Sequence, residues 1–233
     1  MILGTLAYFW LGRSVAVYED RFFIIAISVT VIAATAYLAM ALGMGRVQIA
    51  GKEVMVARYV DWILTTPLII ALLGILAKAS KELIVTLIGV DLYMIGAGFL
   101  GVVAEPLWQS VLWWGIGCVA YLLFLYLFLG AVSKAAKEQP EDVAGIYTTL
   151  RNLTLVLWTL YPLVWITGAN GVDVLPMFVE EGAIVGLDIL SKVVFGYILL
   201  SSHETLRVYD FYGEGRREGT PVASDEGEAA AAD

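Results

Sequence analysis

The sequence predicts an all-α membrane protein, a bundle of seven transmembrane helices with a small β-hairpin between the second and third helices. Of its 233 residues, 60% are apolar and 15% are charged, and the mean hydropathy is +0.83. Several runs of more than about 18 residues carry few or no charges, and runs of that length can cross a bilayer core. We therefore expect a multi-pass protein of the cell membrane, with the lipid bilayer as its first partner.

Other classes of function find little support. The net charge of −8 does not suggest a nucleic-acid partner. The one cysteine, Cys118, excludes an internal disulfide, and the one histidine, His203, gives no metal-ligand cluster. The sequence contains neither a nucleotide-binding loop nor a nucleophile triad, so it predicts no enzyme and no metal site.

The first part of the chain predicts two helices, a hairpin and a third helix. The first helix, Met1 to about Val17, is shorter than the roughly 20 residues of a full span. A charged loop ending at Arg21 separates it from the second helix, Phe22 to Met44. Gly45 to Val56 holds a polar turn between apolar flanks, which is typical of a hairpin. The third helix, Ala57 to Ala77, is unusual because it contains charged residues.

Polar loops separate the four apolar runs that follow. The remaining helices are predicted at Leu83–Val103, Leu107–Val132, Val143–Thr167 and Leu175 to about Val208. Their connections are the charged loop Lys78–Glu82, the turn at Glu105–Pro106, the polar loop Ser133–Asp142 and the turn Gly168–Asp173. We expect one transmembrane domain over residues 1–208, and an acidic, disordered tail over residues 209–233 because that stretch is low in apolar residues.

The distribution of basic residues predicts the orientation. The loops after the first, third and fifth helices and the tail contain Arg21, Lys78, Lys81, Lys134, Lys137, Arg207, Arg216 and Arg217. The opposite loops contain only Arg46 and Lys52. Because cytoplasmic loops are enriched in lysine and arginine, the N-terminus is expected outside the cell and the C-terminus in the cytoplasm.

Four charged residues lie inside predicted spans. Asp188 and Lys192 are four residues apart in an otherwise apolar run, and Arg58, Asp61 and Thr65 share one face of the third helix. A lone ammonium at mid-membrane costs at least a few kcal/mol, so such a lysine usually has a partner or a function. The set could form a static charge network. It could also serve an ion or proton pathway, or bind a cationic ligand covalently, since a lysine amine forms a Schiff base with an aldehyde.

Aromatic residues suggest a cavity for that ligand. Trp158, Tyr161 and Trp165 recur at i, i+3 and i+7 of the sixth helix, with Pro162 able to bend it. Such a stripe is more often plain packing. Beside an internal lysine and two acids, however, it favours a pocket for a long conjugated ligand. Aromatic residues at comparable depth on other helices are Tyr37, Trp62 and Trp114.

Four motifs resemble one family. They are Arg58–Pro67 (RYVDWILTTP), Arg151–Thr154 (RNLT), Leu157–Trp165 (LWTLYPLVW) and Leu187–Lys192 (LDILSK). Their order and spacing resemble those of the microbial (type 1) rhodopsins of haloarchaea, and the resemblance covers the second to the seventh helix.

The resemblance implies a site built around retinal. Lys192 would carry all-trans retinal as a protonated Schiff base, with Asp61 as primary counterion and proton acceptor and Asp188 as second counterion. Arg58 would lie below them, and Thr65 shares the face of Asp61. The expected ligand-contact residues are Tyr37, Trp62, Thr66, Asp91, Met94, Trp114, Trp158, Tyr161, Trp165 and Ser191.

Some positions depart from the pattern of the proton pumps. Leu72 stands where bacteriorhodopsin-type pumps carry a cytoplasmic proton donor, which implies a slow photocycle. The two glutamates that release the proton in such pumps correspond to Asn170 and Glu180, so one acid of the pair is missing here. Ser191 is a hydroxyl residue, as in sensory rhodopsins.

Other positions match the pumps. They are Asp91, which has no apparent basic partner and could hydrogen-bond a neighbouring helix, and Pro176. Gly186 replaces the tyrosine with which sensory rhodopsin II contacts its transducer. The mixture resembles the middle rhodopsins.

A slow photosensory rhodopsin is therefore favoured over a light-driven outward proton pump. Asp61 disfavours a chloride pump. A non-photochemical membrane protein with a static ion network is the alternative of another class. A transducer membrane protein and a homo-oligomer are the protein partners that the resemblance allows.

Overall fold

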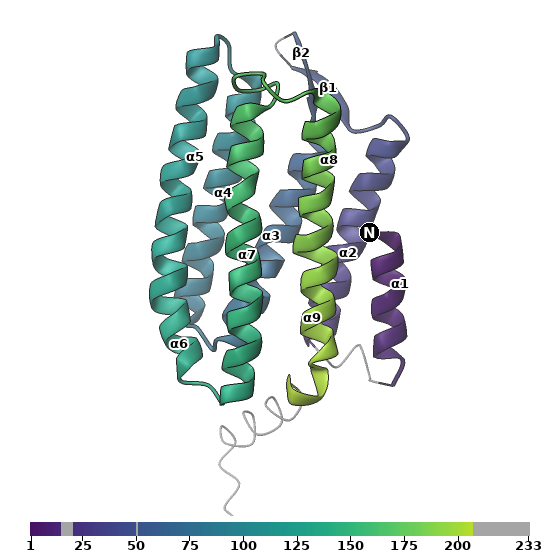
Figure 1. Ribbon diagram of the computed structural model, residues 1–233, viewed down its shortest axis with the longest axis vertical. Helices are drawn as coiled ribbons and strands as arrows, with labels where there is room; N and C mark the ends of the chain where they lie inside the picture. Colours follow the sequence, from purple (N-terminus) through teal and green to yellow (C-terminus); the bar gives the residue numbers. More distant parts are fainter. Residues whose placement is uncertain (15–20, 50, 207–233) are drawn as a thin grey trace, which may run out of the picture.

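The computed structural model describes residues 1–14, 21–49 and 51–206, which form an elongated bundle of helices (Figure 1). The first helices are α1 (Ile2–Leu11), which ends in the 3₁₀ turn η1 (Gly12–Ser14), α2 (Arg21–Ala41), α3 (Val56–Leu76) and α4 (Lys81–Val103). The next helix is continuous and consists of α5 (Leu107–Leu127), η2 (Phe128–Val132) and α6 (Ser133–Lys137). It is followed by α7 (Glu141–Thr167) and by a second continuous helix of α8 (Met177–Asp188), η3 (Ile189–Val194) and α9 (Phe195–Ser201). Both η2 and η3 are π-helical. The predicted order of helices is confirmed within these residues.

Among the described residues, five helices are long and apolar enough to cross a membrane. They are α2, α3, α4, the continuous helix Leu107–Lys137 and the continuous helix Met177–Ser201. Of the seven predicted spans, the first is shorter than these five helices and the sixth, α7, is less apolar. At 1.5 Å per residue the 27-residue α7 is about 40 Å long, enough to span, but it is less apolar than the five. The chain is a multi-pass membrane protein.

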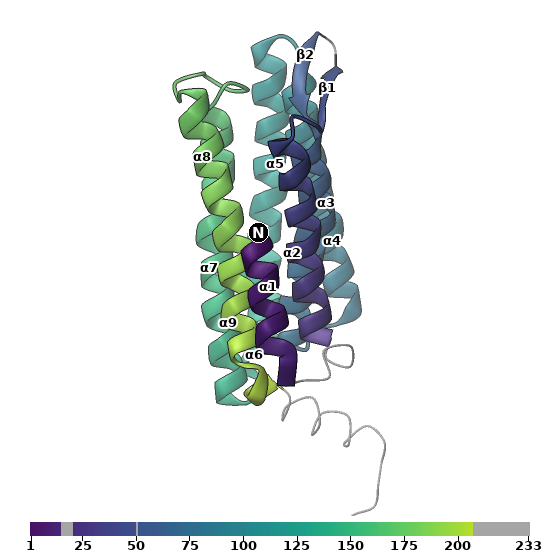
Figure 2. The ribbon, with the colours of Figure 1, turned by 90° about the vertical axis from the view of Figure 1, so that its right-hand side faces the viewer.

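The first helix is short, as predicted. α1 has ten residues, so it is only about 15 Å long. It lies beside α2 and α9 along one half of the bundle (Figures 1 and 2). Residues 15–17, the end of the predicted first helix, lie outside the described residues.

The predicted hairpin is confirmed at one end of the bundle (Figure 1). Its strands β1 (Arg46–Ile49) and β2 (Lys52–Met55) pair antiparallel. Gly51, in the turn, has φ +81°, a backbone conformation that favours glycine. Val54 is buried beneath the hairpin against Tyr59 and Ile95, which ties the hairpin to α3 and α4.

Several predicted helix boundaries are wrong by a few residues, and two of the differences have a local cause. The fifth helix was expected to end at Val132, but the helix continues to Lys137 through η2. The Ser133 hydroxyl donates to the carbonyl of Phe128 (2.9 Å), so a residue typical of loops is satisfied inside the helix. α4 begins at Lys81 rather than Leu83, because the Ser80 side chain caps it by accepting from the amide of Leu83 (3.2 Å).

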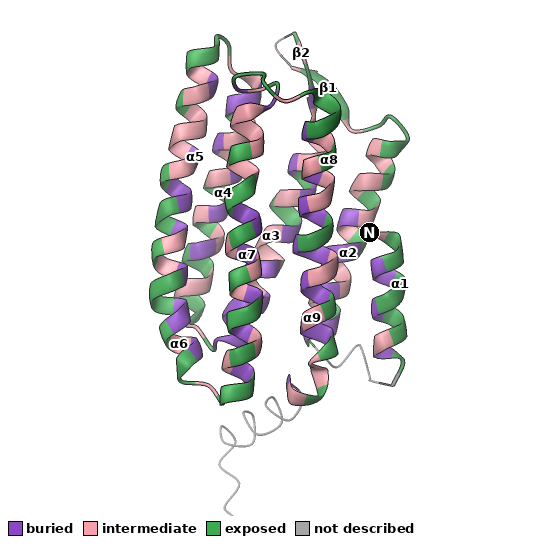
Figure 3. Ribbon diagram, viewed as in Figure 1, coloured by how far each residue is buried: buried purple, intermediate pink, exposed green. Residues whose placement is uncertain are grey.

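The predicted seventh helix begins at Met177 rather than Leu175, and its helical rod ends at Ser201. Val208, its expected end, and the acidic tail over residues 209–233 lie outside the described residues. Buried side chains face the interior of the bundle, and many exposed ones on its outer surface are large and apolar (Figure 3). That pattern suits a bundle whose outer face meets lipid rather than water.

Candidate functional site

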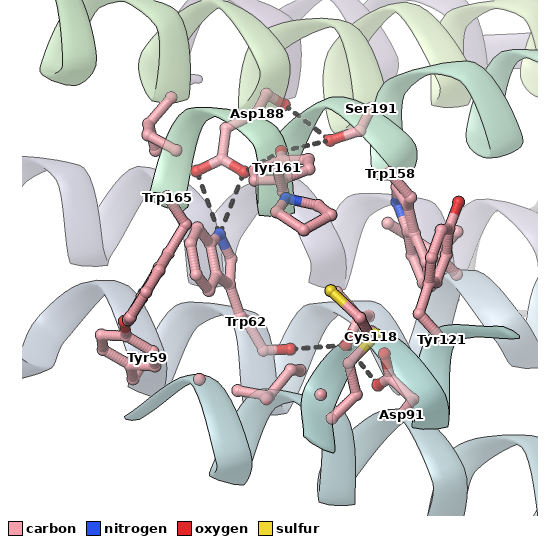
Figure 4. Close-up of a pocket in the computed structure, with 18 of the residues that line it drawn as sticks. Tyr59, Trp62, Asp91, Cys118, Tyr121, Trp158, Tyr161, Trp165, Asp188 and Ser191 are labelled. Atoms are coloured by element: carbon pink, nitrogen blue, oxygen red, sulfur yellow. Dashed lines mark hydrogen bonds between the residues drawn. The ribbon is translucent and has the colours of Figure 1, made fainter. Parts of the chain in front are cut away.

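A cavity lies inside the bundle, between α3, α4, α5, α7 and the α8–η3 helix (Figure 4). Of the residues assigned to ligand contact by resemblance, all but Tyr37 line it, and so do Asp188 and Lys192. Its walls are mainly aromatic and aliphatic. The predicted cavity is therefore present in the fold.

Three helices each line the cavity with the same spacing. The lining positions are 91, 94, 95 and 98 on α4, 114, 117, 118 and 121 on α5, and 158, 161, 162 and 165 on α7. This i, i+3, i+4, i+7 pattern is one face of an α-helix. Residues that were not predicted are Tyr59, Ile69, Ile95, Gly98, Gly117, Cys118, Tyr121, Pro162 and Ile184. Extending the helical spacing from Asp91, Trp114 and Trp158 would have found most of them.

Lys192 sits between two carboxylates. Its Nζ forms ion pairs with Oδ2 of Asp61 and, at 3.2 Å, with Oδ1 of Asp188. No more than 1% of any of the three side chains is exposed. α3 supplies one acid and the α8–η3 helix supplies the other acid and the lysine, so the fold joins charges that lie 131 residues apart in sequence.

The two carboxylates are not equivalent. Asp188 accepts hydrogen bonds from Tyr37 (2.5 Å), Tyr161 (2.6 Å) and the Trp62 indole (3.1 Å). In Asp61, by contrast, Oδ1 has no hydrogen-bond partner among the described residues. The carboxylate of Asp188 is therefore held by three side-chain donors besides Lys192, whereas one oxygen of Asp61 has no donor among the described residues.

Arg58 pairs with an acid that was not predicted as its partner. Its guanidinium pairs with the carboxylate of Glu181, which is 44% exposed, rather than with either aspartate. Lys192 and the two aspartates thus form one cluster, and Arg58 with Glu181 forms another. Thr65 is buried but does not line the cavity, and its hydroxyl donates to the backbone carbonyl of Asp61 (2.8 Å).

Asp91 is tied to a neighbouring helix, as the sequence suggested. The Thr66 hydroxyl on α3 donates to its Oδ2 (2.5 Å), while Oδ1 has no partner among the described residues. The same hydroxyl lies 2.9 Å from the carbonyl of Trp62. The contact links α3 to α4 across the cavity wall.

The Thr66→Val variant tests this link. It keeps the shape of the side chain but removes the hydroxyl, leaving Asp91 without a partner, so we expect a loss of about 1–3 kcal/mol of stability. Unfolding in mixed detergent micelles measures the change. Thr86→Val is the matched control, because Thr86 is an exposed residue of α4 whose hydroxyl donates to the backbone carbonyl of Glu82 in the same helix. Equal losses in both variants would argue against the link.

The arrangement suits a long apolar aldehyde. The amine of Lys192 lies at a cavity with aromatic walls, and its condensation with an aldehyde gives an imine that keeps a positive charge when protonated. The ion pairs to Asp61 and Asp188 remain available to that charge. At Gly98 an added Cβ would meet nothing within 4 Å, so the absence of a side chain leaves room in the cavity.

Comparison with known proteins gives one consistent family. The sequence model of bacteriorhodopsin-like proteins matches residues 1–206. The chain is 42% identical over 233 residues to bacteriorhodopsin of Haloterrigena sp. (strain arg-4), covering 96% of this chain and 88% of that protein. It is 39% identical over 207 residues to sensory rhodopsin-2 of Natronomonas pharaonis, covering 89% and 86% respectively.

Solved structures of similar proteins share the fold. A light-driven proton pump from Leptosphaeria maculans superposes with a TM-score of 0.81 at 30% identity, covering 88% of this chain and 91% of that one. Thermophilic rhodopsin from Rubrobacter xylanophilus gives 0.81 at 35% identity, with 88% and 92% covered. Both values fit a shared seven-helix membrane bundle.

Proposed function

Because the chain belongs to the bacteriorhodopsin-like family, we propose that it is a retinal-based photoreceptor with all-trans retinal attached to Lys192 and a sensory output. The observation that carries the proposal is the buried amine of Lys192 between Asp61 and Asp188, beside a cavity with aromatic walls. A static ion network would not need that cavity.

The residues of the site have separate tasks. Bound as an imine on Nζ, retinal would supply absorption of visible light and a change of shape beside Lys192. Asp188, with three donors besides the lysine, stabilises positive charge at Nζ. Asp61 accepts the proton from Nζ at Oδ2, because it is the less hydrogen-bonded carboxylate. Trp62 and Trp158 help to enclose the cavity and exclude water.

A slow return of the proton to Nζ of Lys192 supports a sensory output. Leu72, eleven residues beyond Asp61 on α3, is 1% exposed and packs in the main apolar core. It cannot donate a proton, so the return to Nζ depends on water reaching a buried nitrogen. A slow return keeps the light-activated form populated for longer, which suits signalling better than pumping.

A light-driven outward proton pump is the second candidate. The contact between Asp91 and Thr66, together with Pro176 before α8, favours it, since the resemblance assigns Asp91 and Pro176 to pumps. The relatives also include both kinds, because one is named a sensory rhodopsin and one of the similar structures is titled a light-driven proton pump.

Adding all-trans retinal to the expressed apoprotein tests the chromophore. We expect a visible band far to the red of free retinal. Absence of any band beyond the absorption of free retinal would remove the photoreceptor proposal and leave the static ion network.

Recovery after a flash, recorded with the pH of an illuminated cell suspension, separates the two outputs. The sensory proposal predicts slow recovery in neutral buffer, acceleration by azide as an external proton carrier, and little acidification. Fast recovery with strong acidification would favour the pump instead.

The charges at the two ends of the bundle support an orientation. Lys78, Lys81, Lys134 and Lys137 lie at the end opposite the hairpin, which carries Arg46 and Lys52. By the positive-inside rule the hairpin end is outside the cell and the C-terminus is cytoplasmic. A sensory output also needs a transducer membrane protein. Gly186 offers no side chain to such a partner, so the transducer contact would have to involve other residues of the helix.

A further inference from the structure

A tyrosine of the short first helix contacts the backbone of the central lysine. Tyr8 is fully buried, and its hydroxyl lies 3.0 Å from the carbonyl oxygen of Lys192 and 2.5 Å from that of Val193. The two contacts join positions 184 and 185 residues apart in sequence. Within the part of the chain that the structure describes, Tyr8 neither lines the cavity nor contacts a carboxylate, so the proposed function gives it no role.

The carbonyls that Tyr8 contacts belong to an irregular stretch of helix. Lys192 and Val193 lie in η3, where hydrogen bonds run to the fifth residue along rather than the fourth. At the end of η3 the amide of Phe195 is shared between the carbonyls of Leu190 and Lys192. The Tyr8 hydroxyl adds a donor from another helix to the carbonyls of Lys192 and Val193.

Two glycines let α1 approach η3 closely. A Cβ added at Gly4 would lie 2.6 Å from Cγ1 of Val193, and one added at Gly196 would lie 2.7 Å from Cζ of Tyr8. Real side chains are essentially never that close, so each helix has a notch that receives a side chain of the other. α1 and α9 lie side by side in both views (Figures 1 and 2). Because the glycines at positions 4 and 196 allow this close packing, the Tyr8 hydroxyl lies beside the backbone of η3.

We propose that Tyr8 is a positioning residue for Lys192: its hydrogen bond holds the π-helical turn in the form that places Nζ between Asp61 and Asp188. The inference deepens the proposed function, because this amine is the one to which retinal would be attached. The hydrogen bond itself is a property of the protein without any ligand, so it can be tested without a chromophore.

The test compares Tyr8→Phe with Tyr197→Phe in the apoprotein. Tyr8→Phe keeps the ring and removes the hydroxyl, whereas Tyr197, on the same helix as Lys192, is 53% exposed. Infrared spectra of protein labelled with ¹³C at lysine carbonyls report the hydrogen bond. Reductive methylation by formaldehyde and borohydride, followed by mass spectrometry, reports how firmly Nζ of Lys192 is held, with the exposed Lys134 as internal standard.

We expect Tyr8→Phe to move a lysine carbonyl band to higher frequency and to speed methylation of Lys192 roughly threefold to tenfold, the factor for loss of one buried hydrogen bond of ordinary strength. Tyr197→Phe should match the unmodified protein in both measurements. An unchanged carbonyl band would overturn the claim that Tyr8 donates a hydrogen bond to the Lys192 carbonyl. A shifted band with unchanged methylation of Lys192 would overturn the positioning role.

Gly196→Ala provides a second variant, because it displaces the Tyr8 ring but keeps the hydroxyl. It should give the same two changes in protein whose helical content is unaltered, and no change in either measurement would contradict the proposal. Failure of the unmodified protein to form a visible pigment is a separate result, which removes retinal as the ligand of the positioned amine.

Discussion

Lys192→Ala is expected to abolish the visible band that all-trans retinal gives with the unmodified protein. No other lysine lines the described cavity, so the aldehyde loses its amine and the protein loses the proton-carrying nitrogen. Absorption spectra after incubation with retinal measure the effect. Lys134→Ala is the matched control, since Lys134 is exposed at the end of the bundle and should leave the band unchanged.

The variant also leaves Asp61 and Asp188 without their ammonium. Breaking a buried pair in this way costs about 3–5 kcal/mol, so folding must be checked by helical content. The double variant Lys192→Ala with Asp61→Asn removes one of the two uncompensated charges and should recover part of the stability. A normal visible band in folded Lys192→Ala protein would contradict the assignment.

Leu72→Asp is expected to speed recovery after a flash by about a hundredfold or more, the range in which a positioned proton donor acts. The substitution places a carboxyl group on α3 eleven residues from Asp61, at a position that packs in the main apolar core. Flash photolysis in neutral buffer measures the recovery. Leu72→Asn is the matched control, since asparagine is polar and similar in size to aspartate but has no acidic proton to transfer.

If Leu72→Asn speeds recovery as much as Leu72→Asp does, the effect comes from water entering a loosened core rather than from a donor. If the unmodified protein already recovers as fast as the aspartate variant, slow proton return is wrong and the sensory preference loses its main support.

Hydrophobic runs and helical spacing predicted much of this molecule. The runs predicted the helices within a few residues, apart from the end of the fifth, and the polar turn around Gly51 predicted the hairpin. The i, i+3, i+7 stripe from Trp158 to Trp165 predicted one cavity wall. These features depend on local periodicity, which a single sequence records well.

Some features that depend on contacts between distant segments were not predicted. No partner was predicted for Arg58; its carboxylate partner, Glu181, lies in a helix that periodicity cannot orient relative to α3. The contact of the π-helical turn at Lys192 with Tyr8 joins residues 184 and 185 positions apart, so no local pattern indicates it. The extension of the fifth helix to Lys137 likewise depends on Ser133 bonding within the helix.

Mapping the site of retinal attachment is the most direct test of the central claim. Borohydride reduction of the pigment fixes retinal on its amine, and mass spectrometry of the digested protein identifies the modified peptide. The proposed function predicts a retinyl group on Lys192 alone. A retinyl group on Lys52, Lys78 or any other lysine, with Lys192 unmodified, would contradict it.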